Sequence, residues 1–220
     1  MLFAAGFGTR MGALTADRPK PLVKVAGKTL LDHALDQVRP HDLRTVVNVH
    51  YKAEMIRKHL TGTDIAISDE SDEILETGGG LRRALPLLGG NPVFTMNTDA
   101  VWNGPNPLDI LLDAWDPARM DALLLCIPTQ NAVGHAGSGD FTLHPDQTIT
   151  RGPGYVYSGV QILKTDGLNA IEEDAFSLNV LWNQMASADR LCGVPYTGQW
   201  CDVGTPEGIA LAEQMVAADV

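Results

Sequence analysis

Two cationic side chains near the start of the sequence could bind a polyphosphate. Arg10 lies in a glycine-rich segment over residues 4–12, and glycines let a backbone approach phosphates and turn its N–H groups toward them. A guanidinium stays charged and binds phosphate oxygens bidentately. Lys20 stands between two prolines, which stiffen its backbone. By itself Lys20 is typical of a solvated turn, but beside the glycine-rich segment we expect it to point at a phosphate.

Two carboxylates, Asp99 and Asp202, are candidate ligands of one Mg²⁺, which prefers hard oxygen ligands. Asp99 follows an apolar segment that predicts a buried strand over 92–97, and an acid at the carboxyl end of such a strand faces the ligand crevice of an open α/β sheet. Asp202 comes shortly before a predicted helix. Structural roles stay open for both, because Asp99 could start a turn and Asp202 could cap that helix.

Two further segments are rich in glycine. Gly78, Gly79 and Gly80 come directly before a predicted helix, and three glycines in a row cost more backbone entropy than a plain turn requires. We interpret them as backbone that contacts a flat nucleobase. The second segment, 134–141, is either a loop that closes over a substrate or a mobile hairpin.

The composition limits the possible partners. The 220-residue chain carries a net charge of −11 and has a pI of about 4.8, which argues against nucleic acid and against an anionic membrane surface. A few local cations still suffice for a small phosphorylated ligand. The three cysteines form no C-x-x-C pair and suit a reducing cytoplasm, and no apolar run is long enough to span a membrane. We expect Cys126 to be packed in the core.

The pattern of apolar residues predicts an α/β fold. Strands are expected at 1–5, 45–50, 64–68, 92–97, 122–127, 140–144, 155–163 and 190–195, and helices at 29–38, 53–60, 80–87, 108–115, 177–188 and 206–217. Early strands and helices alternate, so we predict one domain over 1–220 with a Rossmann-like, open, mixed and mostly parallel sheet flanked by helices. The first strand starts at the first residue, so we expect further residues upstream of it.

Three consecutive segments resemble the opening signature of the sugar-1-phosphate nucleotidyltransferases: residues 3–11 (FAAGFGTRM), 19–23 (PKPLV) and 25–30 (VAGKTL). Residues 200–205 (WCDVGT) resemble a later motif of that family, which holds a metal-binding acid. The resemblance covers essentially the whole chain. It implies that Arg10 contacts phosphate, that Lys20 neutralises the reacting phosphates, and that Asp99 and Asp202 hold Mg²⁺. At Thr98 the family commonly has glycine, so the nucleotide contacts there are expected to differ.

The resemblance also indicates which substrates bind where. LETGGG at 75–80 is similar both to the branch that uridylylates N-acetylmuramate 1-phosphate in bacterial cell-wall recycling and to some mannose-1-phosphate guanylyltransferase-like proteins. GHAGSGDF at 134–141 and YSGV at 157–160 are similar to the first of these branches. Catalysis is assigned to Arg10, Lys20, Asp99 and Asp202. Sugar binding is assigned to Gly139, Asp140, Ser158 and Gly159. Nucleotide binding is assigned to Ala5, Gly6, Gly8, Thr9, Arg10, Met11, Lys20, Glu76, Thr77, Gly78, Gly79, Asn97 and Asp99.

Other functions fit parts of the sequence. Related enzymes use mannose 1-phosphate with GTP, glucose 1-phosphate with dTTP or UTP, or phosphocholine with CTP, and a non-catalytic nucleotide-binding subunit could share the fold. A dinucleotide-binding module fits poorly, because the third glycine of its fingerprint comes one residue late and the predicted second strand ends without an acid. The expected partners are therefore a nucleoside triphosphate and a sugar 1-phosphate, and the sequence leaves the oligomeric state open.

Overall fold

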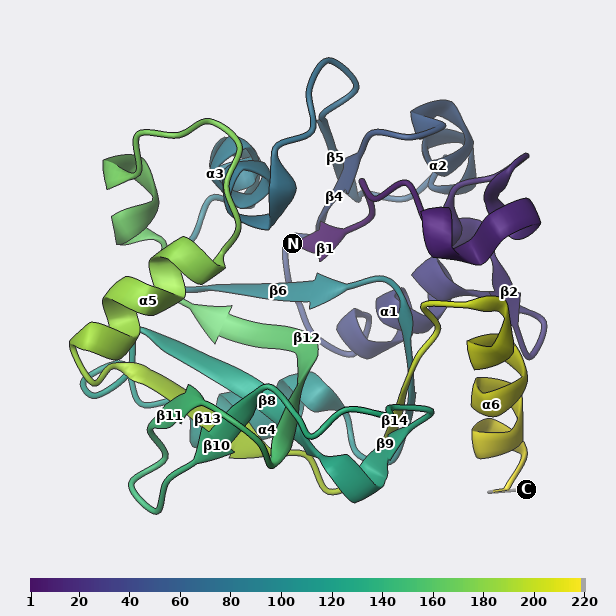
Figure 1. Cartoon of the computed structure of the whole chain (residues 1–220). Helices are drawn as coiled ribbons and strands as arrows, with labels where there is room; N and C mark the ends of the chain where they lie inside the picture. The colour runs from purple at the N-terminus through teal and green to yellow at the C-terminus, as the bar shows by residue number, and fades with distance from the viewer. Residues whose placement is uncertain (219–220) are drawn as a thin grey trace.

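A nine-stranded mixed sheet forms the centre of the protein, as the computed structural model shows (Figure 1). The structure describes residues 1–218, so the last two residues of the predicted domain lie outside it. Seven strands follow the order β11-β10-β12-β6-β1-β4-β5, and β8 pairs with both β12 and β13. Their bounds are β1 (Leu2–Phe3), β4 (Val46–Val49), β5 (Ala66–Asp69), β6 (Val93–Asn97), β8 (Ala122–Pro128), β10 (Phe141–Leu143), β11 (Ile149–Arg151), β12 (Tyr155–Leu163) and β13 (Leu191–Pro195).

Strands β6, β1, β4 and β5 are parallel neighbours, whereas β12 runs antiparallel to β6, β8 and β10. The carboxyl ends of β1, β4 and β6 therefore lie at one edge of the sheet. This confirms the predicted fold class, an open mixed α/β sheet flanked by helices, and places the segment after each of these strands where α/β proteins bind ligands.

Successive residues of β8 point into two different cores, as the period of a strand requires. Leu123 and Leu125 pack with α1 (Leu30–Val38), α2 (Ala53–His59) and α4 (Pro107–Ala114). Leu124 and Cys126 pack on the opposite face with α3 (Glu76–Leu88) and α5 (Asn179–Ser187). Cys126 is fully buried, as predicted, and burial raises the pKa of its thiol to about 12.

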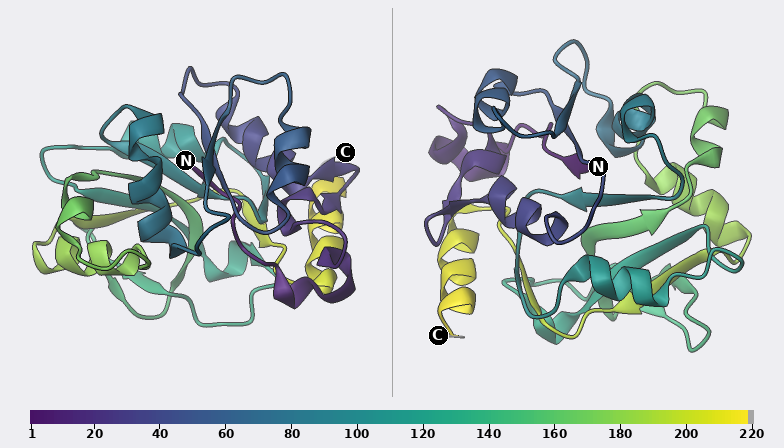
Figure 2. Two further views of the ribbon diagram at one scale, coloured as in Figure 1. Left: turned by 90° about the horizontal axis from the view of Figure 1, so that it is seen from above. Right: turned by 180° about the vertical axis from the view of Figure 1, so that it is seen from behind.

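A second, three-stranded sheet lies beside the main one and consists of β7 (Ala100–Asn103), β14 (Gln199–Asp202) and β9 (Ala132–Val133). A third core cluster joins this small sheet to the C-terminal helix α6 (Pro206–Ala217). Figure 2 shows α6 at the edge of the molecule, far from α3 and α5 in both views. The remaining elements are the hairpin β2 (Lys24–Val25) and β3 (Lys28–Thr29) and the 3-10 helices η1 (Thr9–Thr15), η2 (Lys20–Leu22), η3 (Thr129–Asn131) and η4 (Asp166–Ala170).

Local capping explains where three helices begin. Thr29 accepts a hydrogen bond from the backbone N–H of Asp32 at the start of α1, at 3.1 Å, and Asn106 accepts one from Leu108 N at the start of α4, at 2.8 Å. Helix α6 begins with Pro206 after Thr205, a position that suits proline. Since Thr205 is the N-cap of α6, Asp202 does not cap this helix, and its carboxylate is available for another role.

The start of α3 differs from the prediction. We expected a glycine loop followed by a helix from residue 80, but α3 begins at Glu76 and contains all three glycines. Gly78 N and Gly79 N both donate to Phe176 O, at 2.8 and 3.1 Å. A Cβ on Gly78 would lie 2.3 Å from the Phe176 ring, and one on Gly79 would lie 2.2 Å from Asp174 O. Gly78 and Gly79 are therefore required by the close packing of residues 174–176 on the helix, whereas a Cβ on Gly80 would lie 2.6 Å from Glu70 Oε1.

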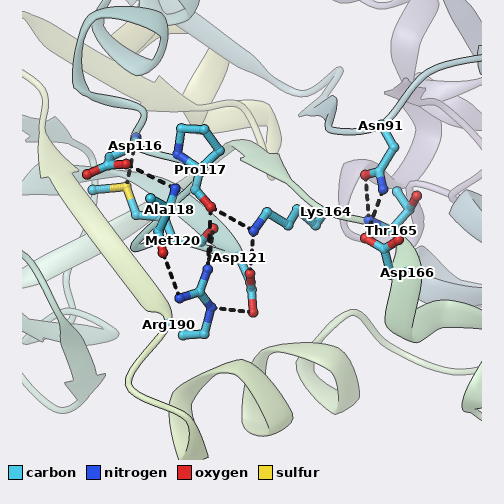
Figure 3. A network of polar contacts seen from close by, with 10 residues as sticks. All are labelled: Asn91, Asp116, Pro117, Ala118, Met120, Asp121, Lys164, Thr165, Asp166 and Arg190. Atoms are coloured by element: carbon cyan, nitrogen blue, oxygen red, sulfur yellow. Dashed lines mark hydrogen bonds and ion pairs between the residues drawn. The ribbon is translucent and has the colours of Figure 1, made fainter.

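A polar network ties three strands together at the edge opposite the carboxyl end of β6 (Figure 3). Asp121, just before β8, forms ion pairs of 2.8 Å with both Lys164, just after β12, and Arg190, just before β13. These cations lower the pKa of Asp121, with Arg190 as the larger cause. Within residues 1–218, no helix has the length and apolar character needed to cross a membrane.

Candidate active site

The glycine-rich segment follows β1 and is anchored at both of its ends. Ala4 N donates to the Asn48 side chain on β4 at 2.7 Å, and Met11 is completely buried in the third core cluster. Between these anchors, a Cβ on Gly8 would lie 2.8 Å from the Lys20 side chain, so glycine is needed for Lys20 to pack here. A Cβ on Gly6 would meet nothing within 4 Å, and Gly6 faces a cavity.

We call this first cavity the loop cavity. It has a volume of about 410 Å³, which is within the usual range of small-molecule sites. Its walls come from the glycine-rich segment, η2, the carboxyl ends of β4, β5 and β6, and the start of α3. Its lining includes Ala5, Gly6, Lys20, Asn48, Glu70, Glu76, Thr77, Asn97 and Asp99.

We call the second cavity, of about 450 Å³, the bulge cavity because an irregularity in β12 forms one wall. The register between β12 and β8 breaks between Tyr157 and Gln161. Within the break, Gly159 has a φ of 84°, and a Cβ there would lie 2.8 Å from the Asn97 amide nitrogen. The Ser158 carbonyl accepts from Trp200 Nε1 at 3.1 Å. The bulge therefore directs Ser158 and Gly159 at the cavity, opposite Asn97.

Other walls of the bulge cavity carry charge. Arg10 and Asp202 approach from the side of the small sheet, and His135 and Asp140 come from the segment 134–140. Asp140 Oδ2 accepts a hydrogen bond from Tyr157 N at 2.8 Å, which fixes this carboxylate against β12. Asp140 N in turn donates to Tyr155 O at 2.7 Å. The end of the 134–140 segment is therefore bonded to the sheet.

The loop cavity and the bulge cavity meet at Asn97 and Asp99, which line both. Lys20 Nζ donates to Asp99 Oδ2 at 2.8 Å, and Lys20 is only 9% exposed. Asp202 lies opposite Ala100 in the β7–β14 pair, and Val203 N donates to Asp99 O at 2.8 Å. The two carboxylates therefore come together although they are distant in the sequence.

The charges at this junction favour a divalent cation. Burial raises the pKa of Asp202, the neighbouring Asp99 raises it further, and Lys20, Arg10 and His135 oppose the shift. A cation between the carboxylates would relieve this repulsion. No group of three or more metal-ligating side chains occurs within residues 1–218. Two carboxylates, with waters and substrate phosphates completing the shell, are the set that Mg²⁺ commonly uses, so the residues fit the predicted ion.

The structure brings twelve of the predicted residues to these cavity walls. They are Ala5, Gly6, Arg10, Lys20, Glu76, Thr77, Asn97, Asp99, Asp140, Ser158, Gly159 and Asp202. The other predicted residues do not line either cavity: Gly8, Thr9, Met11, Gly78, Gly79 and Gly139. Gly8, Met11, Gly78 and Gly79 serve the packing described above. Gly139 lies against the β12 backbone, where a Cβ would be 2.8 Å from Tyr155 N.

Thr98 occupies the position where the resembled family commonly has glycine. Its side chain is 3% exposed, and its hydroxyl donates to Phe3 O at 2.7 Å. The side chain thus ties the end of β6 to the end of β1. The threonine therefore fixes the position of the backbone directly before Asp99.

Sequence reasoning missed two polar residues of the loop cavity. Asn48 donates to Glu70 Oε1 at 2.8 Å, and Glu70 is 1% exposed. Burial raises the pKa of the Glu70 carboxyl. Asn48 lies near the end of the strand predicted over 45–50, and Glu70 follows the strand predicted over 64–68. These positions were the signal available in the sequence, because the carboxyl ends of parallel strands meet at one edge of a sheet. A third missed residue, Arg151, lines a neighbouring cavity and is discussed below.

Comparison with known proteins identifies the family. Residues 1–145 match the family model of the MobA-like NTP transferase domain. The chain is 42% identical to the N-acetylmuramate alpha-1-phosphate uridylyltransferase of Caulobacter vibrioides, over 99% of this chain and 96% of that protein. It is 33% identical to the enzyme of the same name from Neisseria meningitidis, over 99% and 98%.

Among solved structures, HddC from Yersinia pseudotuberculosis superposes with a TM-score of 0.75 over 97% of each chain, at 21% identity, which supports the fold. The family model and the two relatives establish the family as well as the fold, since they match most of the chain in sequence. The chain belongs to the MobA-like NTP transferase family and is a nucleotidyltransferase.

Proposed function

We propose that this nucleotidyltransferase transfers a uridylyl group from UTP to N-acetylmuramate 1-phosphate, releasing pyrophosphate. The observation that carries the proposal is that Asn97 and Asp99 line both the loop cavity and the bulge cavity, so that two substrates bound there meet at Asp99. The names of the two relatives with 42% and 33% identity support the choice of substrates.

The loop cavity suits the nucleotide. Its floor is the backbone of Ala5 and Gly6 at the end of β1, where a phosphate can approach main-chain N–H groups. Lys20 lies at the end that opens toward the bulge cavity, and Arg10 faces that cavity from the loop. Both cations therefore stand where the phosphates of a nucleotide would pass from one cavity to the other.

The bulge cavity suits the sugar phosphate. Asp140 is fixed by Tyr157 N and leaves a carboxylate oxygen for sugar hydroxyls. The Ser158 hydroxyl accepts from Val160 N at 3.1 Å and keeps its own hydrogen for donation. Small residues at 158 and 159 leave room for a substituted ring.

The reaction would be one in-line displacement. An oxygen of the sugar phosphate attacks the α-phosphorus of the triphosphate, the new P–O bond forms, and the bond to the pyrophosphate oxygen breaks. Since the nucleophile is already an anion, no general base is needed, and catalysis comes from alignment and charge neutralisation. Lys20 would offset charge on the approaching phosphates, and Arg10 would hold the leaving pyrophosphate. Mg²⁺ bound to Asp99 and Asp202 would add further neutralisation of phosphate charge.

A guanine nucleotide is the second candidate, because one feature of the loop cavity favours it. Glu70 places a carboxylate in this cavity, and guanine offers an N–H and an amino group to such an acceptor, whereas uracil offers a single N–H. The corresponding reaction would join GTP to mannose 1-phosphate. The assay below therefore includes both pairs.

The test is pyrophosphate release in the presence of Mg²⁺. UTP, dTTP, GTP and CTP are crossed with N-acetylmuramate 1-phosphate, N-acetylglucosamine 1-phosphate, glucose 1-phosphate, mannose 1-phosphate and phosphocholine. We expect the highest kcat/KM with UTP and N-acetylmuramate 1-phosphate. A clear preference for another pair would refute the proposed substrates but leave the proposed reaction type in place. A rate unchanged by EDTA would refute the proposed dependence on Mg²⁺.

A further inference from the structure

A third cavity continues from the other two and contains a cation that the proposed reaction does not use. We call it the arginine cavity, because Arg151 at the end of β11 lines it. It shares Asn97 with both other cavities, and it shares Asp140 and Tyr157 with the bulge cavity. Asp99 and Asp202 do not line it, so it extends away from the phosphate junction.

Arg151 is held in a defined position. It lies opposite Phe141 in the β10–β11 pair, and its guanidinium is 4.5 Å from the centre of the Phe141 ring and 5.6 Å from that of Trp182. Arg151 also donates to the Asn179 side-chain oxygen. Stacking on aromatic faces leaves the edge of a guanidinium free to bind a planar anion.

The support for Arg151 is itself rigid. Trp182 Nε1 donates to Gln161 Oε1 at 2.9 Å, and Gln161 Nε2 donates to Thr95 Oγ1 at 3.1 Å, both inside the core. Arg151 itself is exposed and therefore accessible to a ligand. Its contacts with the Phe141 and Trp182 rings and its bond to Asn179 limit the side-chain freedom that it would lose on binding.

Arg151, like Arg10 of the bulge cavity, keeps its charge available for a ligand. No carboxylate in the described part of the chain forms an ion pair with it, whereas most arginines of the protein have such a partner. The walls of the bulge cavity carry three carboxylates, from Asp99, Asp140 and Asp202. A second negative group on a sugar phosphate would be repelled there unless a cation met it.

We infer that Arg151 binds the lactyl carboxylate of N-acetylmuramate 1-phosphate and so determines the choice of acceptor. This inference rests on the proposed function. N-acetylmuramate differs from N-acetylglucosamine only by the lactyl ether on O3, which adds one carboxylate to the sugar. A sugar placed between Asp140 and Ser158 has the arginine cavity beside it, where that carboxylate can meet the guanidinium as a bidentate pair.

The test compares two acceptors in wild type and in Arg151→Gln, with UTP and Mg²⁺ constant. We expect the substitution to lower kcat/KM for N-acetylmuramate 1-phosphate by about 10- to 100-fold, as loss of a charge-assisted bidentate contact does. The kcat/KM for N-acetylglucosamine 1-phosphate should change by less than about threefold, because that acceptor makes no such contact. Arg151→Lys should recover part of the preference, since it keeps the charge without the fork.

Arg44→Gln is the matched control, because Arg44 is an exposed arginine without an ion pair in the described residues and lines none of these three cavities. It should leave both kcat/KM values at the wild-type level. The methyl ester of the lactyl group provides a second arm, since it keeps the shape and removes the charge. The kcat/KM of wild type should be lower with the ester than with the free acid. The kcat/KM of Arg151→Gln should be the same with both.

The outcomes separate the two proposals. A wild-type enzyme that prefers N-acetylmuramate 1-phosphate, combined with an Arg151→Gln variant that slows both acceptors equally or neither, would overturn the role of Arg151 and keep the proposed function. A wild-type enzyme that does not prefer the lactyl-bearing acceptor would overturn both. Thermal unfolding of each variant shows whether a loss of rate comes from a loss of fold.

Discussion

Gly159→Ala tests whether the bulge in β12 sets the geometry shared by the three cavities. Gly159 has a φ of 84°, and its added Cβ would lie 2.8 to 2.9 Å from three atoms of the Asn97 side chain. The left-handed backbone costs about 1–2 kcal/mol for an alanine, and overpacking adds about 1–3 kcal/mol. We expect a loss of about 2–5 kcal/mol, which corresponds to a fall in Tm of about 4–20 °C for a chain of this size.

Gly62→Ala is the control for this variant. Gly62 also has a φ of 84°, but a Cβ there would meet nothing within 4 Å. Gly62→Ala should lower the free energy of unfolding only by the cost of the left-handed backbone, about 1–2 kcal/mol, and leave kcat unchanged. Gly159→Ala should lower kcat as well, because Asn97 lines all three cavities and must move. Calorimetry and the pyrophosphate assay measure both effects. Equal Tm shifts in the two variants, with full activity in Gly159→Ala, would refute the reasoning.

Three further predictions concern single carboxyls. Asp99→Asn should lower kcat by about 100-fold or more and leave the far-UV circular dichroism unchanged; near-normal turnover would contradict the metal role. Glu70→Gln keeps the oxygen that accepts from Asn48 but removes the ionisable group. Because burial raises the folded pKa of Glu70 above its ordinary value of 4.5, wild type should lose stability relative to the variant as the pH rises from 4.5 through that raised pKa; parallel plots of Tm against pH would contradict this. Asp121→Asn should cost about 1 kcal/mol at pH 7. Its folded pKa is depressed below 3.8, so the difference from wild type should shrink as the pH is lowered from 3.8 toward that pKa; denaturant titrations that show no decrease of the difference on acidification would contradict it.

Sequence patterns predicted the long elements well. The strand over 155–163 and the helix over 206–217 match β12 and α6 residue for residue, and the other predicted elements have counterparts shifted at their ends. The helix was predictable because α6 buries one face, and the strand was predictable because β12 is a long apolar run buried inside the sheet. The loop motifs also placed Lys20 and Asp99 in one cavity, although 79 residues separate them.

What the sequence did not predict depends on contacts between distant segments. Strands β7, β9 and β14 have two to four residues each and carry no periodic signal, and β14 pairs with β7 across about 100 residues of chain. The glycines of α3 are explained only by distant contacts, with Phe176 and Asp174 at Gly78 and Gly79 and with Glu70 at Gly80. No sequence motif marks Arg151, and its position over Phe141 and Trp182 depends on the pairing of β11 with β10.

The walls of the two main cavities come from different stretches of the chain. Apart from Ser177, the loop cavity is built from residues 3–99, whereas the bulge cavity takes most of its wall from residues 133–140, 156–159 and 200–205. If the bulge cavity holds the acceptor, as proposed, substitutions in the later stretches would reshape the acceptor site while the framework of the loop cavity stays unchanged. Such a division would give the fold a route to diversify its acceptors in small steps, with a working enzyme at each stage.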